Sequence, residues 1–192
     1  MFDIITFGSA TQDIMVRPKK LTVLKYDPPS QKATDGQSKK FTFDKGVCFP
    51  LGSKIDIEDM KFNSGGGGTN TATTFAKQGF KTAFCGTVGN DIAGKEIINE
   101  LKKLKINTSF VIKTNKKLTN HSVVILNEGE DRTILTYRGA AELMDKTDIP
   151  WNKLKTKWIY MAPLSGLLCD NFENIVNFAF ENKIKIAINP GI

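Results

Sequence analysis

Short apolar runs alternate along the chain with longer segments in which apolar residues recur three and four positions apart. The short runs are typical of buried strands and span Phe2–Phe7, Thr82–Val88, Trp158–Met161 and Ile184–Ile188. The longer segments predict helices over residues 69–79, 91–103 and 170–182. Because strands and helices alternate, the pattern predicts an α/β fold with a mostly parallel sheet flanked by helices and joined by right-handed crossovers.

Period-two alternation marks other parts of the chain as strands of a different kind. Residues 41–49 and 55–62 alternate partially across a Pro-Leu-Gly-Ser segment, which predicts a hairpin. Residues 17–46 are rich in proline and polar residues and predict loops broken by short strands. Further strands are expected at 109–112, 122–127 and 132–136, and a turn at 128–131 joins the last two.

Length and composition are those of an ordinary globular protein. The chain has 192 residues, 40% of them hydrophobic and 24% charged, which suits one domain with a sizeable core. It contains neither an apolar run of about 18 residues nor the features of a signal peptide at its start, so we expect no membrane association and a cytoplasmic location. Cys48, Cys85 and Cys169 are widely spaced and are expected to be reduced structural thiols.

The net charge of +7 raises the question of a nucleic-acid partner. Lysines cluster at 102–103, 116–117 and 153–157, with few aromatic residues between them and no nucleic-acid-binding module around them. A solvated basic surface is therefore the better interpretation, and no nucleic-acid partner is expected. Such a surface would still attract anionic substrates.

The most distinctive segment is Ser64-Gly65-Gly66-Gly67-Gly68-Thr69-Asn70. Glycines let the backbone approach a ligand closely, and a helix that starts there would present unpaired N–H groups to hydroxyl or phosphate oxygens. The segment is not a P-loop, because no Gly-Lys-Ser/Thr follows it. A dinucleotide-binding fingerprint is also a weaker interpretation, since its third glycine is needed where Asn70 stands.

Six residues around this run match a known signature at fixed spacing. They are Gly66, Gly68, Asn70, Ala72, Gly79 and Gly89, and Asp91 and Gly94 continue the pattern. In these positions the chain resembles the first signature of the ribokinase-like (PfkB) family of carbohydrate kinases. The resemblance covers nearly the whole chain and implies a ribokinase-like fold with a small β-sheet lid, for which residues of about 10–62 are the candidate. In the family such a lid closes over the sugar and often forms a homodimer contact.

The resemblance also implies an acceptor site for a small-molecule sugar or sugar acid. Asp13 corresponds to an aspartate near the end of the first strand that accepts hydrogen bonds from two sugar hydroxyls, and Gly66, Gly67 and Asn70 are expected to contact the acceptor. Arg138 could bind a carboxylate or phosphate on an acidic sugar, and an ordinary surface arginine is the alternative. Ribokinases carry a lysine in the glycine run where this chain has Gly67, which argues against ribose.

The family's catalytic element does not occur in these 192 residues. Neither the Gly-Ala-Gly-Asp segment, whose aspartate is the catalytic base, nor the Asn-x-x-Glu motif is found in the sequence. The resemblance implies ATP and Mg²⁺ in the complete enzyme, but no site for either is evident in this chain. Residues 1–192 are therefore expected to form the N-terminal, acceptor-binding part of an incomplete kinase domain, inactive on its own, with the nucleotide-binding part absent.

Two other functions are compatible with the same sequence. One is a non-catalytic sugar-binding or dimerising module that retains the lid. The other is a kinase of the adenosine-kinase branch, in which a nucleoside is the acceptor and Phe41, Phe43 and Phe49 provide a surface for the base. Those aromatic residues could equally pack the lid against itself.

Overall fold

A computed structural model describes residues 1–25, 45–127 and 131–191. The chain divides into two compact units, which are described separately. The first comprises Met1–Ile14, Phe62–Val123 and Leu135–Ile192, and the second comprises Met15–Lys61 and Val124–Ile134. The first unit contains the parallel sheet, its helices and the candidate site residues.

The first unit is built on a five-stranded sheet with strand order β11-β10-β1-β6-β7. These strands span Phe2–Phe7 (β1), Thr82–Gly89 (β6), Asn107–Thr114 (β7), Thr156–Met161 (β10) and Lys185–Ile188 (β11). Every neighbouring pair in this order is parallel. All eight residues of β6 are buried, as expected for a central strand covered on both faces. The α/β fold with a parallel sheet is therefore confirmed.

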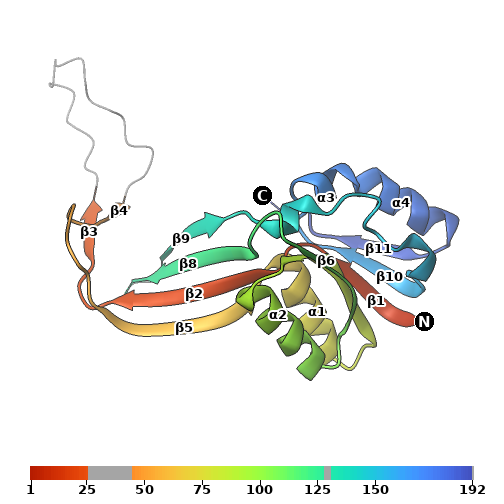
Figure 1. The fold of residues 1–192 in the computed structure, drawn as a ribbon, viewed down its shortest axis with the longest axis horizontal. Helices are drawn as coiled ribbons and strands as arrows, with labels where there is room; N and C mark the ends of the chain where they lie inside the picture. Colours follow the sequence, from red (N-terminus) through yellow and green to blue (C-terminus); the bar gives the residue numbers. More distant parts are fainter. Residues whose placement is uncertain (26–44, 128–130, 192) are drawn as a thin grey trace, which may run out of the picture. The chain divides into compact units, whose positions relative to one another are not determined.

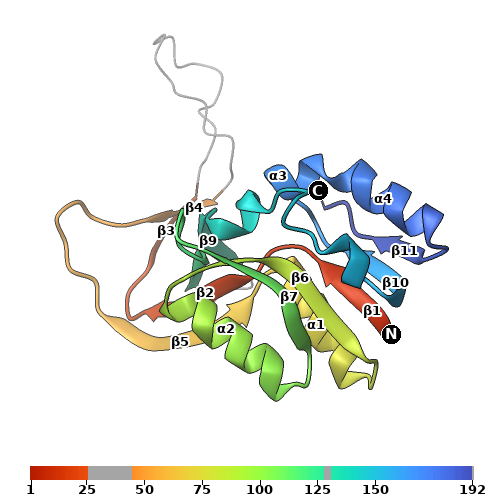
Figure 2. The same cartoon turned by 45° about the vertical axis from the view of Figure 1, so that its right-hand side comes forward.

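Helices cover both faces of this sheet, as Figure 1 and Figure 2 show. Helices α1 (Gly67–Lys77) and α2 (Ile92–Lys103) lie on one face, and α3 (Leu167–Asp170) and α4 (Phe172–Glu181) lie on the other. Each side has its own core: Phe84, Val88 and Ile97 are fully buried on the first side, and Ile5, Met161 and Ile175 on the second. Because β6 contributes to both cores, the two helix layers are fixed to one sheet.

Two helix boundaries differ from the predictions. The first helix begins at Gly67, not Thr69, because the backbone of the glycine run is already helical there. The helix predicted over 170–182 is α4, which begins at Phe172, and the short helix α3 before it was not predicted; the two meet at Asn171. The side-chain amide of Asn171 donates to the carbonyl oxygens of Met144 and Leu167, which fixes the junction against the core. Two short 3-10 helices, η1 (Ala140–Leu143) and η2 (Trp151–Lys153), precede β10.

Six further strands form two smaller sheets. A four-stranded sheet has the order β5-β2-β8-β9, and β3 pairs with β4 in an antiparallel two-stranded sheet. The strands span Thr11–Pro18 (β2), Thr22–Lys25 (β3), Lys45–Cys48 (β4), Ile57–Gly65 (β5), Asn120–Leu126 (β8) and Arg132–Tyr137 (β9).

The predicted hairpin between residues 41–49 and 55–62 is wrong in its pairing. Its first strand, as far as the described residues show it, is β4 and pairs with β3, whereas β5 lies beside β2. Alternation identified the strands correctly but carries no information about which strand is the neighbour. Residues 41–44 and most of the predicted turn at 128–131 lie outside the described residues.

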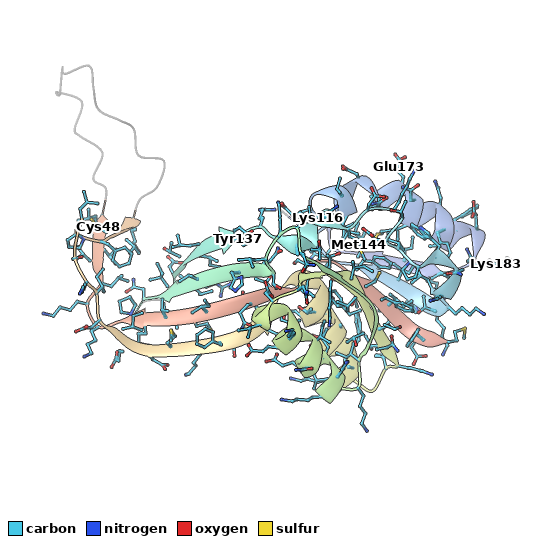
Figure 3. The ribbon with its side chains drawn as sticks, in the orientation of Figure 1. Cys48, Lys116, Tyr137, Met144, Glu173 and Lys183 are labelled. Carbon is cyan, nitrogen blue, oxygen red and sulfur yellow. The ribbon has the colours of Figure 1, made fainter. Side chains whose placement is uncertain are left out.

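The cysteines and the helices agree with a globular protein. All three cysteines are free, and Figure 3 labels Cys48, which is exposed at the end of β4. Cys85 is buried in β6, and burial raises the pKa of its thiol. Within residues 1–25, 45–127 and 131–191, no helix has the length and apolar character that a membrane crossing requires.

Candidate functional site

The order of the parallel strands creates a natural ligand position at the carboxyl ends of β1 and β10. In the sheet, β6 and β7 lie on one side of β1, and β10 and β11 lie on its other side. Helices therefore leave this point toward opposite faces of the sheet, and ligands of open α/β sheets bind at such switch points. The glycine run lies here, because a Cβ atom on Gly67 would come 2.9 Å from the Cβ of Ala162, the residue that follows β10.

Ser9, two residues beyond the end of β1, binds the start of α1. Its carbonyl oxygen accepts from the N–H groups of Gly68 at 3.0 Å and Thr69 at 3.3 Å, and its hydroxyl accepts from the N–H of Gly67 at 3.1 Å. The next N–H, that of Asn70, donates to the carbonyl oxygen of Gly66 at 2.9 Å. The expectation that the first N–H groups of this helix are unpaired is therefore wrong. Their partners are within the chain, so this helix start is not a ready anion site.

Gly66 is the residue of the run whose backbone conformation requires glycine. Its φ of 99° lies in the region that side-chain-bearing residues rarely adopt. A Cβ atom there would also come 2.5 Å from the carbonyl oxygen of Ser9. This geometry turns the chain from β5 into α1 while it stays in contact with the end of β1.

Asp13 lies in β2, as its third residue, and not at the end of β1. Its half-buried carboxylate is pressed against the end of β5, because a Cβ atom on Gly65 would come 2.0 Å from Oδ2 of Asp13. On the other side of β2, in β8, the hydroxyl of Ser122 donates a hydrogen bond to the same carboxylate. The carboxylate is thus held between two neighbouring strands.

The environment of Asp13 is less favourable to charge than water is. Burial raises the pKa of its carboxyl group above the ordinary value, and the hydrogen bond from Ser122 lowers it in part. A partly desolvated carboxylate gains more from each hydroxyl that donates to it than an exposed one does. Asp13 is therefore suited to accept hydrogen bonds from a polyhydroxylated ligand.

Asn70 lies in the first turn of α1, and its side chain is exposed. Its main chain is occupied: the N–H donates to Gly66, and the carbonyl oxygen accepts from the hydroxyl of Thr74 at 2.9 Å. Its side-chain amide makes no hydrogen bond with the described parts of the chain, and so can both donate to a ligand and accept from it. The helix fixes the backbone of Asn70 next to the glycine run.

Arg138 follows β9 and is 67% exposed in its side chain. Its guanidinium lies 3.9 Å from Oε1 of Glu142, and the other carboxylate oxygen of Glu142, Oε2, lies 3.6 Å from the ammonium of Lys117. Exposed pairs at such distances are weak, so Glu142 holds the guanidinium loosely. Within the described part of the chain, no hydrogen bond or ion pair joins Arg138 directly to Asp13 or to the glycine run.

The backbone beside Arg138 is nevertheless fixed by β8. The side-chain oxygen of Asn120 accepts from the N–H groups of Gly139 and Ala141, both at 3.0 Å. Asn120 and Ser122 are two positions apart in the strand, so they share a face and lie about 7 Å apart. This face of β8 therefore supports both Asp13 and the segment that follows Arg138.

Asp91, which continues the signature, has a structural role. Its carboxylate caps α2 by accepting from the N–H of Gly94 at 2.8 Å, and it also accepts from the N–H and the hydroxyl of Thr119, both at 2.7 Å. Burial acts to raise the pKa of Asp91, but these hydrogen bonds outweigh it, and the pKa lies below the ordinary value. Asp91 therefore joins α2 to the start of β8.

Sequence reasoning missed Ser9 and Ser122, and it named Gly65 only as part of the run. No local pattern identifies these residues, because each acts on a partner more than fifty positions away in the chain.

Among the described residues, no three histidine, cysteine, aspartate or glutamate side chains gather closely enough to hold a metal ion. Phe49 is 39% exposed, and Phe41 and Phe43 lie outside the described residues.

Several curated proteins are similar to part of this chain. A ribokinase from Staphylococcus aureus is 30% identical over 99 residues, which cover 51% of this chain and 33% of the ribokinase. A deoxyribokinase from Salmonella typhi is 26% identical over 141 residues, 72% of this chain and 46% of that protein. A guanosine-inosine kinase from Exiguobacterium acetylicum is 31% identical over 115 residues, which cover 56% of this chain and 37% of that protein. The matches thus cover between a third and a half of these relatives.

Solved structures agree on the fold. A PfkB protein from Polaromonas superposes with a TM-score of 0.75 at 18% identity, covering 100% of this chain and 56% of that one. A sugar kinase from Pyrococcus horikoshii in complex with ATP superposes with a TM-score of 0.71 at 20% identity, covering 98% of this chain and 53% of that one. The family model described as pfkB family carbohydrate kinase matches residues 44–183. The chain therefore belongs to the pfkB family of carbohydrate kinases.

Proposed function

We propose that this chain supplies the acceptor-binding half of an ATP-dependent kinase that phosphorylates a sugar hydroxyl. The observation that carries the proposal is the placement of Asp13. Its half-buried carboxylate is held between Ser122 and Gly65, in the same unit as the glycine run at the switch point of the sheet. Membership of the pfkB family supplies the reaction class.

In this proposal the acceptor is held by Asp13 and Asn70, with the backbone of Gly66 and Gly67 beside it. The carboxylate accepts from acceptor hydroxyls, and the amide of Asn70 donates and accepts. Arg138 would bind the acidic group of a sugar acid. ATP with Mg²⁺ supplies the phosphoryl group in the complete enzyme, but the residues of this chain do not fit that role. The first N–H groups of α1 are paired, and the described residues form no metal-binding cluster.

An open apolar groove supports the proposal that a further segment completes the enzyme. It has a volume of about 430 Å³ and lies on the side of β10 and β11 that is beside α1. Its lining consists of five apolar residues and one ion pair: Ile4, Phe75, Phe80, Trp158 and Ala187, with Asp3 and Lys157. Trp158 is 40% and Phe80 is 48% exposed, which is unusual for large apolar side chains that lie together. The nucleotide-binding part of the domain is the proposed cover for this face.

The second unit is the proposed lid and homodimer contact. Strand β5 exposes Ile57 by 47% and Met60 by 52%, and β9 exposes Ile134 by 45%. Exposed apolar side chains on outer strands favour association with another copy of the same surface. Light scattering of the purified chain tests this proposal, because substituting Ile57 and Met60 by serine should convert a dimer to a monomer.

Calorimetric titration tests the acceptor site. The 192-residue chain is titrated with hexoses, pentoses, sugar acids and nucleosides, and Asp13→Ala should weaken the binding of the true acceptor by about 10–100-fold through loss of a charged hydrogen-bond acceptor. Nucleoside binding without sugar binding would favour a nucleoside kinase, such as the guanosine-inosine kinase among the relatives. Binding that is unaffected by Asp13→Ala would contradict the proposed site.

The second test concerns catalysis. We expect no sugar-dependent release of ADP by residues 1–192 alone, because proton transfer and charge stabilisation, worth roughly 10²–10⁴-fold and 10²–10³-fold, have no group here to provide them. Supplying the C-terminal part of a pfkB kinase should give turnover. Turnover by the 192-residue chain that Asp13→Ala abolishes would show that the catalytic machinery is misplaced in this proposal. A completed enzyme that binds sugar and never turns over would favour a non-catalytic module.

A further inference from the structure

The carboxylate of Asp13 has two neighbours that do not titrate, one on each side of β2. Gly65 at the end of β5 limits how far the carboxylate moves in one direction, because Oδ2 lies 2.0 Å from the position that a Cβ atom on Gly65 would take. Ser122 on β8 lies on the opposite side, since β2 is between β5 and β8 in the sheet. The carboxylate therefore has a neighbour on both sides, and the Ser122 side offers it a side-chain hydrogen bond.

Ser122 is itself held firmly. It is only 9% exposed and lies in a strand whose Asn120, on the same face, is fixed by two backbone N–H groups. A buried hydroxyl in a regular strand has few orientations available. Its hydrogen bond to Asp13 therefore restricts the rotation of the carboxylate as well as its position.

We propose that Ser122 is a positioning residue for acceptor binding: its hydroxyl holds one side of the Asp13 carboxylate, so that the remaining lone pairs point toward the hydroxyls of the acceptor. This inference rests on the proposed acceptor-binding function. A carboxylate offers about four acceptor positions, and one bond to Ser122 leaves enough for two hydroxyls of a sugar. Pre-organisation of this kind strengthens binding because the carboxylate need not be ordered when the ligand arrives.

The test compares four variants of the 192-residue chain in two measurements. Ser122→Ala removes the hydroxyl, Ser122→Thr retains it, and Ser122→Cys retains the volume with a much weaker donor. Ser109→Ala is the matched control, because Ser109 is an exposed strand serine whose hydroxyl donates to the nearby side chain of Asn107, at 2.6 Å. The first measurement is the titration of the Asp13 side-chain carboxyl by ¹³C NMR without ligand, and the second is calorimetric titration with the acceptor from the panel above.

The expected results are specific to the hydroxyl. Ser122→Ala and Ser122→Cys should raise the titration midpoint of Asp13 and weaken acceptor binding by about tenfold, whereas Ser122→Thr and Ser109→Ala should leave both close to the wild type. A midpoint that does not move in Ser122→Ala or in Ser122→Cys would overturn the inference. So would a moved midpoint with unchanged affinity for a bound acceptor.

If the proposed function itself is wrong, the experiments give a different result. If no sugar or nucleoside binds to the wild-type chain, the acceptor site is refuted, and the positioning role of Ser122 falls with it. The NMR titration would still report whether Ser122 and Asp13 are coupled, because it is made without ligand. The NMR titration and the binding measurement together therefore distinguish failure of the Ser122 inference from failure of the proposed acceptor site.

Discussion

Substituting Gly65 by alanine should displace the carboxylate of Asp13 and little else. The new methyl group would lie 2.0 Å from Oδ2 and 2.6 Å from Cγ of Asp13, and the backbone of Gly65 itself is not in a glycine-only conformation. Ordinary contact begins near 3.4 Å, so Oδ2 must retreat by about 1.4 Å. Because Ser122 lies on the opposite side of β2, a shift of this size changes the length and angle of its hydrogen bond to the carboxylate.

The magnitude follows from two opposing effects. Forcing an extra methyl group into a filled position typically costs about 1–3 kcal/mol. Replacing glycine by alanine lowers the entropy of the unfolded chain and stabilises the folded state by about 0.4–1 kcal/mol. We therefore expect Gly65→Ala to lower the free energy of unfolding by about 1.3 kcal/mol, the difference between the midpoints of these two ranges. It should also weaken acceptor binding as strongly as Asp13→Ala does.

A double-mutant cycle tests whether the added methyl group collides with Asp13. In the Asp13→Ala background the clashing carboxylate is gone, so Gly65→Ala should be neutral or stabilising by up to about 1 kcal/mol. The free energies of unfolding of the wild type, both single variants and the double variant are measured by urea titration. Equal destabilisation by Gly65→Ala in both backgrounds would refute the reasoning, because the methyl group would then collide with something other than Asp13.

Three further predictions concern the scaffold. Gly66→Ala should destabilise the protein by about 2 kcal/mol or more in urea titration, because its φ of 99° and its contact with Ser9 both exclude a side chain; a loss below about 0.5 kcal/mol would contradict this. Asn120→Ala leaves two buried N–H groups without a partner and should cost about 2–4 kcal/mol, whereas the control Asn115→Ala, at an exposed pair, should cost little. Asp91 has a lowered pKa in the folded state, so its stabilisation is present above the unfolded pKa of about 4 and is lost as the pH falls through the folded value; Asp91→Asn should therefore lower Tm at pH 7 and leave a shallower fall in Tm below pH 4.

The sequence predicted those parts of the fold that depend on local pattern. Apolar runs such as Phe2–Phe7 became the parallel sheet because a strand buried on both faces has to be apolar throughout. The helix predicted from residue 91 is α2, which begins at Ile92, and the Asp91 carboxylate that caps it belongs to the adjacent residue. These predictions hold because the energies involved come from residues close together in the chain.

The pairing of strands and the partners of the site could not be predicted in this way. Period-two alternation gives the face of a strand but not its neighbour, so β4 and β5 were paired with each other and not with β3 and β2. The same limit hid Ser9 and Ser122. Ser9 occupies the N–H groups that the glycine motif alone suggested were free, and only the crossover from β1 to α1 brings it there.

The pairing of those N–H groups has a consequence for the choice of acceptor. A helix start with free N–H groups would favour a phosphate or carboxylate, but here Ser9 and Gly66 accept from the first four of α1. The carboxylate of Asp13 contacts the glycine run at Gly65. This negative charge repels anions and attracts hydroxyl donors. In the proposed acceptor site, this local chemistry would favour a neutral polyhydroxylated acceptor over an acidic one. A sugar acid would have to bind with its acidic group directed away from Asp13, and Arg138, held only loosely by Glu142, is the residue proposed to receive it.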